Sequence, residues 1–147
     1  MLDNKTLALA LISWFCAQFF KVVFNFIKTN KINLSLFFSA GGMPSSHSAF
    51  VTSMTFSIAL NNGFSSDLFA VCLIMSLIVM YDAAGVRRAA GKQAAVINII
   101  LEQIEKQGIK IDTQLKELLG HSPIEVIGGA FLGFIITCFN FIINFYF

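Results

Sequence analysis

The sequence predicts an all-α integral membrane protein in which residues 1–147 form a single transmembrane domain with four spanning helices. An amphipathic helical segment is expected between the third and fourth spans. Hydrophobic residues make up 56% of the chain and charged residues only 12%, whereas soluble domains carry about 25% charged residues. The length also suits about four membrane segments joined by short connections. A water-soluble fold is therefore disfavoured.

The first span is predicted over residues 6–27, an apolar run interrupted by a polar stripe. Gln18, Lys21, Asn25 and Lys28 follow one another at steps of three and four residues, which places them on one face of a helix. A lysine inside a membrane helix costs about 2.5–3.5 kcal/mol unless it faces protein or water. The stripe is therefore expected to face a polar interior.

The second and third spans are predicted over 47–60 and 68–84, with a turn between them at 61–67. The second span is short and rich in Ser and Thr, whose hydroxyl groups hydrogen-bond between helices in lipid. The third span is almost purely apolar until it reaches Asp82. The serines of the second span are therefore expected to be packing residues.

The amphipathic segment is expected over 89–119 and the fourth span over 123–145. Apolar residues of the segment share one helical face, Glu and Lys take the other, and Gly108 ends the pattern. Such a segment could lie on the membrane surface or cover a site. Gly129 and Gly133 of the fourth span form a GxxxG pair that permits close helix packing, although scattered glycines would give the same pattern.

The distribution of basic residues predicts the orientation in the membrane. With four spans, the N-terminal tail and loop 61–67 lie on one side, and loops 28–46 and 82–122 lie on the other. Outside the membrane the first side carries only Lys5, whereas the second carries eight basic residues. Because cytoplasmic loops are enriched in Lys and Arg, the second side is predicted to be cytoplasmic.

The same topology gathers the residues capable of chemistry at this predicted cytoplasmic face. They are Lys28 from the first span, His47 from the second, Asp82, Arg87 and Arg88 from the third, and His121 and Glu125 from the fourth. Two helix N-termini, after Pro44 and after Gly120, offer backbone N–H groups and positive dipole ends at this face. The topology therefore predicts a site for an anion such as phosphate.

The residue types near the two histidines suit this ligand. The segment before the second span supplies adaptable backbone and hydroxyl groups through Gly41, Gly42, Ser45 and Ser46. Arginine binds phosphate oxygens in bidentate geometry, and lysine adds a point charge. His121 and Glu125 are four residues apart, so a helix would set the carboxylate beside the imidazole, where it can fix the tautomer. Histidine itself can donate a proton or act as a nucleophile near neutral pH.

These residues resemble the type 2 phosphatidic acid phosphatase superfamily, which includes membrane lipid phosphatases and vanadium haloperoxidases. The stretches GGMPSSHSA, YDAAGVRRAAGKQA and LLGHSPIEVIGGAFLG resemble, more closely, a small and divergent bacterial membrane branch of that superfamily. The resemblance extends over most of the chain, from about residue 20 to residue 135.

Each of the three superfamily motifs is altered in this sequence. The first motif, Lys-x6-Arg-Pro, is represented by Lys21 and Lys28, with threonine in place of the proline. The second, Pro-Ser-Gly-His, ends at His47 and has serine in place of the glycine. The third, Ser-Arg-x5-His-x3-Asp, is represented by His121 and Glu125, and no arginine lies six residues before this histidine. The nearest upstream arginines are Arg87 and Arg88.

The resemblance implies a phosphatase that acts on a lipid phosphate in the bacterial cytoplasmic membrane, of the phosphatidate, phosphatidylglycerophosphate or polyprenyl phosphate type. His121 would attack phosphorus and form a phosphohistidine, Glu125 would orient it, and His47 would protonate the leaving alcohol. The phosphate would be held by Lys21, Lys28, Ser45, Ser46 and one or both of Arg87 and Arg88, with Asp82, Gly41 and Gly42 in supporting roles. The resemblance implies no metal, no other cofactor and no nucleic-acid partner.

Other interpretations remain open. The altered motifs are also compatible with a lipid-phosphate-binding or scaffold protein without turnover, with the amphipathic segment as its contact surface. A metal site built from Asp82, Glu125 and the histidines would suit Mg, Mn or Zn, although the spacing matches no recognised ligand pattern. Lys21 could snorkel, and Arg87 and Arg88 could be interfacial anchors. A homo-oligomer is also compatible with the sequence.

Overall fold

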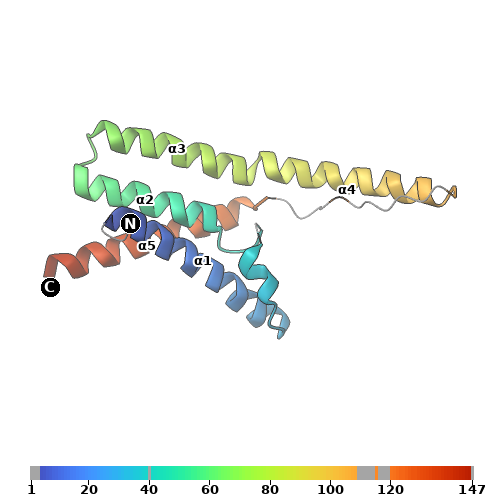
Figure 1. Ribbon diagram of the computed structural model, residues 1–147, viewed down its shortest axis with the longest axis horizontal. Helices are drawn as coiled ribbons and strands as arrows, with labels where there is room; N and C mark the ends of the chain where they lie inside the picture. Colours follow the sequence, from blue (N-terminus) through green and yellow to red (C-terminus); the bar gives the residue numbers. More distant parts are fainter. Residues whose placement is uncertain (1–3, 40, 109–114, 116–119, 147) are drawn as a thin grey trace.

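The computed structural model describes residues 4–39, 41–108, 115 and 120–146. Their elements are α1 (Lys5–Thr29), the short 3-10 helix η1 (Leu34–Phe38), α2 (Ser46–Asn62), α3 (Asp67–Ala84), α4 (Val86–Glu105) and α5 (Pro123–Tyr146). No strand occurs in these described residues. Helices α1, α2, α3 and α5 form one bundle, and α1 begins and α5 ends at the same end of it (Figure 1). The prediction of an all-α protein is confirmed.

Three helical stretches of the described chain are long and apolar enough to cross a membrane. They are α1, the run of α3 and α4 over Asp67–Glu105, and α5 over Pro123–Asn144. Helix α2 has 17 residues, or about 25 Å of helix, and it packs against α1, α3 and α5. When α3 and α4 are counted as one long bent helix, the described residues form four helices of a membrane protein, as predicted.

Polar residues explain where two of these helices begin. The side chain of Asn4 accepts the backbone N–H of Leu7, and that of Ser66 accepts the N–H of Phe69. These bonds satisfy donors that the first turn of a helix leaves without an internal partner. Helix α1 ends at Asn30, which adopts a left-handed φ of 52°. The ends of α1, α2, α3 and α5 lie within two residues of those expected from the sequence.

Hydroxyl groups join α2 to its three neighbours. The bonded pairs are Ser57 with Thr6 of α1 at 2.9 Å, Thr55 with Ser76 of α3 at 2.6 Å, and Ser53 with Thr137 of α5 at 2.9 Å. In lipid, apolar side chains gain little from leaving the solvent, so hydrogen bonds and close packing hold helices together. The Ser and Thr residues of α2 therefore act as packing residues.

Helices α2 and α5 approach each other at two glycines. A Cβ atom added at Gly129 would overlap the carbonyl oxygen of Ser45, and one added at Gly133 would overlap the carbonyl oxygen of Ala49. The GxxxG pair is therefore a close-packing surface and not a chance occurrence. This contact also sets the start of α2 against the first half of α5.

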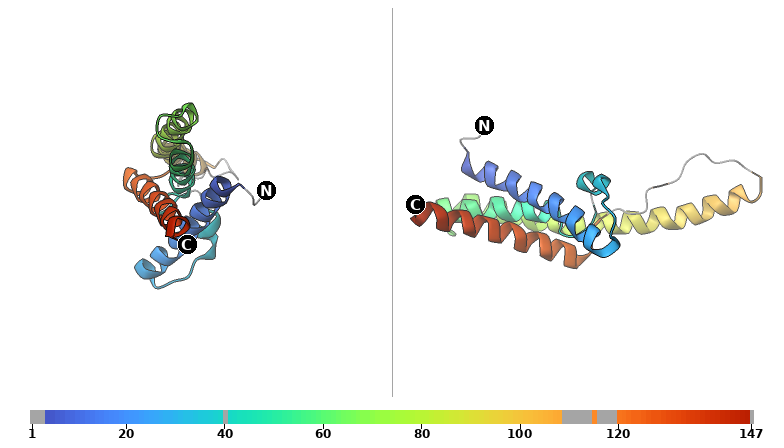
Figure 2. Two further views of the ribbon diagram at one scale, coloured as in Figure 1. Left: turned by 90° about the vertical axis from the view of Figure 1, so that its left-hand side faces the viewer. Right: turned by 90° about the horizontal axis from the view of Figure 1, so that it is seen from below.

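Helix α4 continues in nearly the same direction as α3 and extends beyond the bundle (Figures 1 and 2). It begins three residues before the expected amphipathic segment, and its apolar residues Val96, Ile97 and Ile100 are exposed. The helix ends at Glu105, and a turn follows up to Gly108. The later part of the expected segment, 109–119, lies outside the described residues except for Leu115.

The connection from α1 to α2 folds back along α1. The ring of Phe37 in η1 contacts the rings of Trp14 and Phe15, at centroid distances of 6.3 Å and 5.4 Å. Both partners lie near the middle of α1, so part of the connection 28–46 packs beside a helix that is predicted to span the membrane. Leu34 and Phe38 of η1 present their side chains outward.

Candidate functional site

The two histidines of the chain lie side by side. Their ring centroids are 6.0 Å apart and the ring planes are inclined by 67°. His47 occupies the first turn of α2, and His121 lies two residues before α5 begins. Because α2 and α5 run beside each other and start at the same end of the bundle, residues 74 positions apart meet there. The expected convergence of the two imidazoles is present in the structure.

His121 is held on two sides. Its Nδ1 lies 3.0 Å from Oε2 of Glu125, and its backbone N–H donates to the carbonyl of Ala83 at 2.8 Å. The His121 side chain is 1% exposed and the Glu125 side chain 25%. Glu125 also accepts the backbone N–H of Ser122 at 3.1 Å. In return, Ser122 Oγ lies 3.4 Å from the Glu125 nitrogen, which is the arrangement of a capping box.

Lys21 points from α1 toward the start of α2. Its side chain is buried, and its ammonium donates to the carbonyl of Ser39 at 3.1 Å and to Oγ of Ser46 at 3.3 Å. A buried cation beside a hydroxyl group makes this corner of the bundle suited to an anionic group. The expectation that Lys21 faces a polar interior agrees with these contacts.

Only part of the polar stripe of α1 faces the interior of the bundle. Gln18 is buried like Lys21, Asn25 is half-buried, and Lys28 is exposed. Lys28 lies two turns beyond Lys21, where α1 extends away from α2 and α5 (Figures 1 and 2). The structure therefore does not bring Lys28 together with the histidines, because the helix leaves the bundle before reaching it.

The segment before α2 lies over Lys21. Gly42 adopts a positive φ of 99°, and a Cβ there would stand 3.7 Å from Cδ of Lys21. A Cβ at Gly41 would stand 3.7 Å from the carbonyl oxygen of Gly120. Both glycines thus lie where the loop passes close to Lys21 and to Gly120.

Ser45 and Ser46 are both buried but have different contacts. Ser45 Oγ accepts the N–H of Ser48 and so caps α2, and the Ser45 N–H donates to the carbonyl of Glu125 at 2.9 Å. Ser46 faces Lys21 instead. Ser45 therefore serves as the N-cap of α2.

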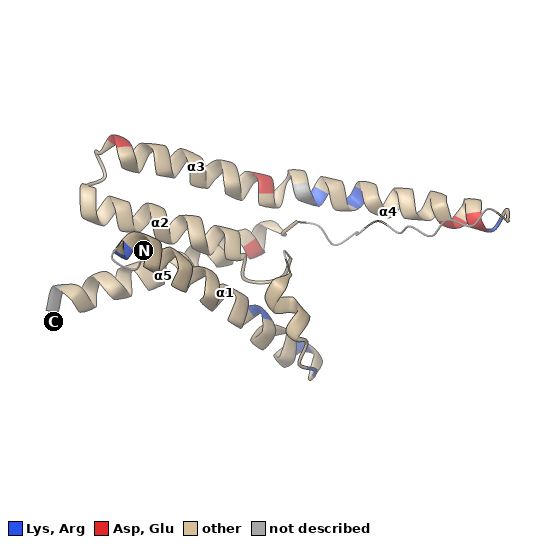
Figure 3. Ribbon diagram, in the orientation of Figure 1, with Lys and Arg blue, Asp and Glu red and all other residues tan. Residues whose placement is uncertain are grey.

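The junction of α3 and α4 brings the remaining residues near this end. Asp82 lies in the last turn of α3, Arg87 and Arg88 lie in the first turn of α4, and Arg88 is exposed. The bond from His121 to Ala83, next to Asp82, ties this junction to the site. The described charges collect at this end and along α4, apart from Lys5 and Asp67 at the starts of α1 and α3 (Figure 3).

A metal centre is not seen in the described part of the chain. None of its residues form a group of three or more His, Cys, Asp or Glu side chains that could hold an ion. Asp82, Glu125 and the histidines therefore do not assemble as that alternative required.

Sequence reasoning missed the groups that fix His121 and Lys21. The role of Ser122 could have been recognised from the sequence, because Ser122-Pro-Ile-Glu125 has the spacing of a capping box. The carbonyl groups of Ala83 and Ser39 could not have been recognised as partners, since any residue type can supply a backbone carbonyl.

The fold and the site together define a helical membrane protein with a buried imidazole–carboxylate pair and a buried lysine at one end of the bundle. Residues 2–136 match the family described as the Divergent PAP2 family, and the chain belongs to this family. The chain is also similar to the uncharacterized membrane protein YuiD of Bacillus subtilis strain 168. The two are 44% identical over 151 residues, which cover 93% of this chain and 94% of that protein. No solved structure matches the chain.

Proposed function

We propose that the protein is a membrane phosphatase that hydrolyses a lipid phosphate through a phosphohistidine intermediate. The observation that carries the proposal is the pairing of the two imidazoles, 6.0 Å apart, with one of them bound to a carboxylate. Membership of the Divergent PAP2 family supports the same chemistry. In this proposal, one small region supplies a nucleophile, a proton donor and a cation.

In the proposed first step, Nε2 of His121 attacks phosphorus. Glu125 accepts the proton on Nδ1, so the lone pair lies on Nε2, and the carboxylate stabilises the positive charge that develops on the ring. The bond from phosphorus to the lipid oxygen breaks, and His47 gives that oxygen a proton. Water then attacks the phosphohistidine with His47 as base, which releases inorganic phosphate and restores both histidines.

The phosphate oxygens would be held by charge and by hydrogen-bond donors. Lys21 and Ser46 are already directed toward each other beside the histidines, and the start of α2 adds its positive dipole end. Arg87 and Arg88 are proposed to add charge from the α3–α4 junction. Stabilisation of developing charge is the main requirement of phosphoryl transfer.

The surroundings of the site support a lipid as the proposed substrate. Exposed apolar side chains of η1, such as Leu34 and Phe38, lie on the connection that leads into the site. We propose that a phosphatidate, phosphatidylglycerophosphate or polyprenyl phosphate approaches from the lipid on this side. The placement of basic residues supports a location of the site at the cytoplasmic face.

The test is phosphate release from a panel of lipid phosphates by purified protein, with and without EDTA. Wild-type protein should release phosphate in both conditions, and His47→Ala and His121→Ala should each abolish release from the lipids. Glu102→Gln is a matched control, because this exposed carboxylate pairs with Lys106 on α4, away from the histidines. Loss of activity on chelation would point to metal chemistry. Absence of release from every lipid would favour a binding protein without turnover.

A further inference from the structure

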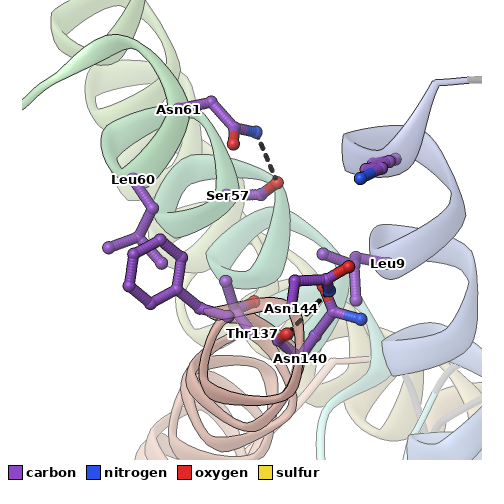
Figure 4. Close-up of a pocket in the computed structure, with 9 residues that line it drawn as sticks. Leu9, Ser57, Leu60, Asn61, Thr137, Asn140 and Asn144 are labelled. Atoms are coloured by element: carbon purple, nitrogen blue, oxygen red, sulfur yellow. Dashed lines mark hydrogen bonds between the residues drawn. The ribbon is translucent and has the colours of Figure 1, made fainter. Parts of the chain in front are cut away.

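A cavity lined by both polar and apolar side chains lies at the end of the bundle opposite the histidines. It has a volume of about 180 Å³ and lies between the start of α1, the end of α2 and the end of α5 (Figure 4). Its polar lining is supplied by Lys5, Ser57, Asn61, Thr137, Asn140 and Asn144. A water molecule occupies about 30 Å³ of liquid, so the space is large enough for a small polar group and not only for one water.

Two facing polar stripes build this cavity. On α2, Ser53, Ser57 and Asn61 recur every four residues. On α5, Thr137, Asn140 and Asn144 recur at steps of three and four. Toward the middle of the bundle, Ser53 of α2 is hydrogen-bonded directly to Thr137 of α5. Nearer the end of the bundle, the side chains of the two stripes line the cavity instead (Figure 4). Polar side chains at the ends of apolar helices that surround a cavity indicate a binding site.

The lining carries more hydrogen-bonding capacity than it uses internally. Asn144 donates to Asn140, and Asn61 has only long contacts of 3.5 Å to Thr6 and Ser57. Within the described residues no acidic side chain pairs with Lys5. Its ammonium also sits in the first turn of α1, where the helix dipole disfavours a cation and where no acidic residue compensates it. Lys5 is therefore suited to an external anion.

We propose that this cavity binds the phosphodiester headgroup of a membrane phospholipid. One lysine beside neutral amide groups matches a single negative charge with several hydrogen-bonding oxygens. Leu9, Leu60 and Phe141 line the same cavity with apolar surface. The acyl chains would lie on the exposed apolar residues of α1 and α5, such as Ile12 and Ile142. The site at the histidines, with more cations around it, is proposed to take a phosphate monoester instead.

Binding can be measured on the full-length protein in detergent by native mass spectrometry and by the shift of the unfolding temperature. The probes are a short-chain phosphatidylglycerol, the diacylglycerol with the same chains, and inorganic phosphate. Phosphatidylglycerol should bind and stabilise the protein, and the diacylglycerol should not. An equal response to inorganic phosphate at the same concentration would assign the cavity to free phosphate and overturn the lipid proposal.

Variants assign the binding to this cavity. Lys5→Gln and Asn140→Leu should each weaken phosphatidylglycerol binding about tenfold, as expected for the loss of a hydrogen bond to a charged group, and Lys5→Arg should keep it. Lys106→Gln is the matched lysine control. His121→Ala should leave this binding unchanged, which separates the result from the fate of the proposed phosphatase activity. Equal binding by wild-type protein and a folded Lys5→Gln variant would overturn the proposal.

Discussion

The His121 ring is almost fully enclosed, and its Nδ1 lies 3.0 Å from Oε2 of the Glu125 carboxylate. We expect Glu125→Gln to lower kcat about 10²–10⁴-fold with little change in KM, because the amide cannot stabilise a positive imidazole as a carboxylate does. The amide oxygen can still accept the Ser122 N–H, so the start of α5 should be preserved. Steady-state kinetics of Glu125→Gln and of the control Glu102→Gln measure the effect. Equal kcat values for the two variants would show that Glu125 has no role in the mechanism.

His47 should respond to the nature of the leaving group. If it protonates the departing oxygen, His47→Ala should slow release from a lipid alcohol about 10²–10⁴-fold. An aryl phosphate, whose phenolate needs no proton to depart, should lose far less activity. His121→Ala should abolish both reactions. A His47→Ala variant that loses lipid and aryl substrates to the same extent would contradict the proton-donor role.

At the scale of elements, the glycines of α5 make the sharpest prediction. Gly133→Ala should destabilise the bundle by about 1–3 kcal/mol, because the added methyl group meets the backbone of α2 and cannot be accommodated by a side-chain rotation. Gly128→Ala is the matched control, since its Cβ would meet the flexible end of Met43 at 3.2 Å and Cβ of Pro44 at an ordinary contact distance of 4.0 Å. Thermal unfolding in detergent measures the difference, and equal unfolding temperatures would contradict the close contact.

The η1 element should lie in lipid. A nitroxide attached at position 38, in a chain whose three cysteines are replaced by serine, should collide more with oxygen than with a water-soluble nickel chelate, because Phe38 is 85% exposed beside an aromatic cluster on α1. The same label at position 106, on an exposed side chain at the end of α4, supplies the aqueous reference. Higher nickel accessibility at position 38 would place η1 in water.

The helix ends could be predicted because apolar runs and capping residues are local signals. The meeting of His47 with His121 and Glu125 also followed from the sequence, since alternating spans bring their ends to common faces. The packing of Phe37 on Trp14 could not be predicted, because it depends on contacts between distant parts of the chain. The exposure of Lys28 could not be predicted for a similar reason. Helical spacing shows which residues share a face of a helix, but it does not show how far the neighbouring helices extend along that face.

At the scale of the whole molecule, the arrangement in the membrane can be measured directly. Single cysteines at positions 31 and 106 should react with a membrane-impermeant reagent from the cytoplasmic side, and one at position 62 from the opposite side. Both expectations follow from the placement of basic residues. Labelling of positions 31 and 62 from the same compartment would exclude an arrangement in which α2 crosses the membrane.

Most of the buried side chains among the described residues are small. The largest fully buried side chains are His121, Thr55 and Thr137, followed by serines, whereas many phenylalanine, isoleucine and leucine side chains face outward. Tolerance to substitution should therefore run opposite to that of a soluble protein. Exchanges among bulky apolar residues on the outside should pass almost unnoticed. Enlarging a buried alanine or serine by even a methyl group should be selected against. In a mutational scan, the positions that tolerate substitution least should therefore be the small residues in the centre of the bundle.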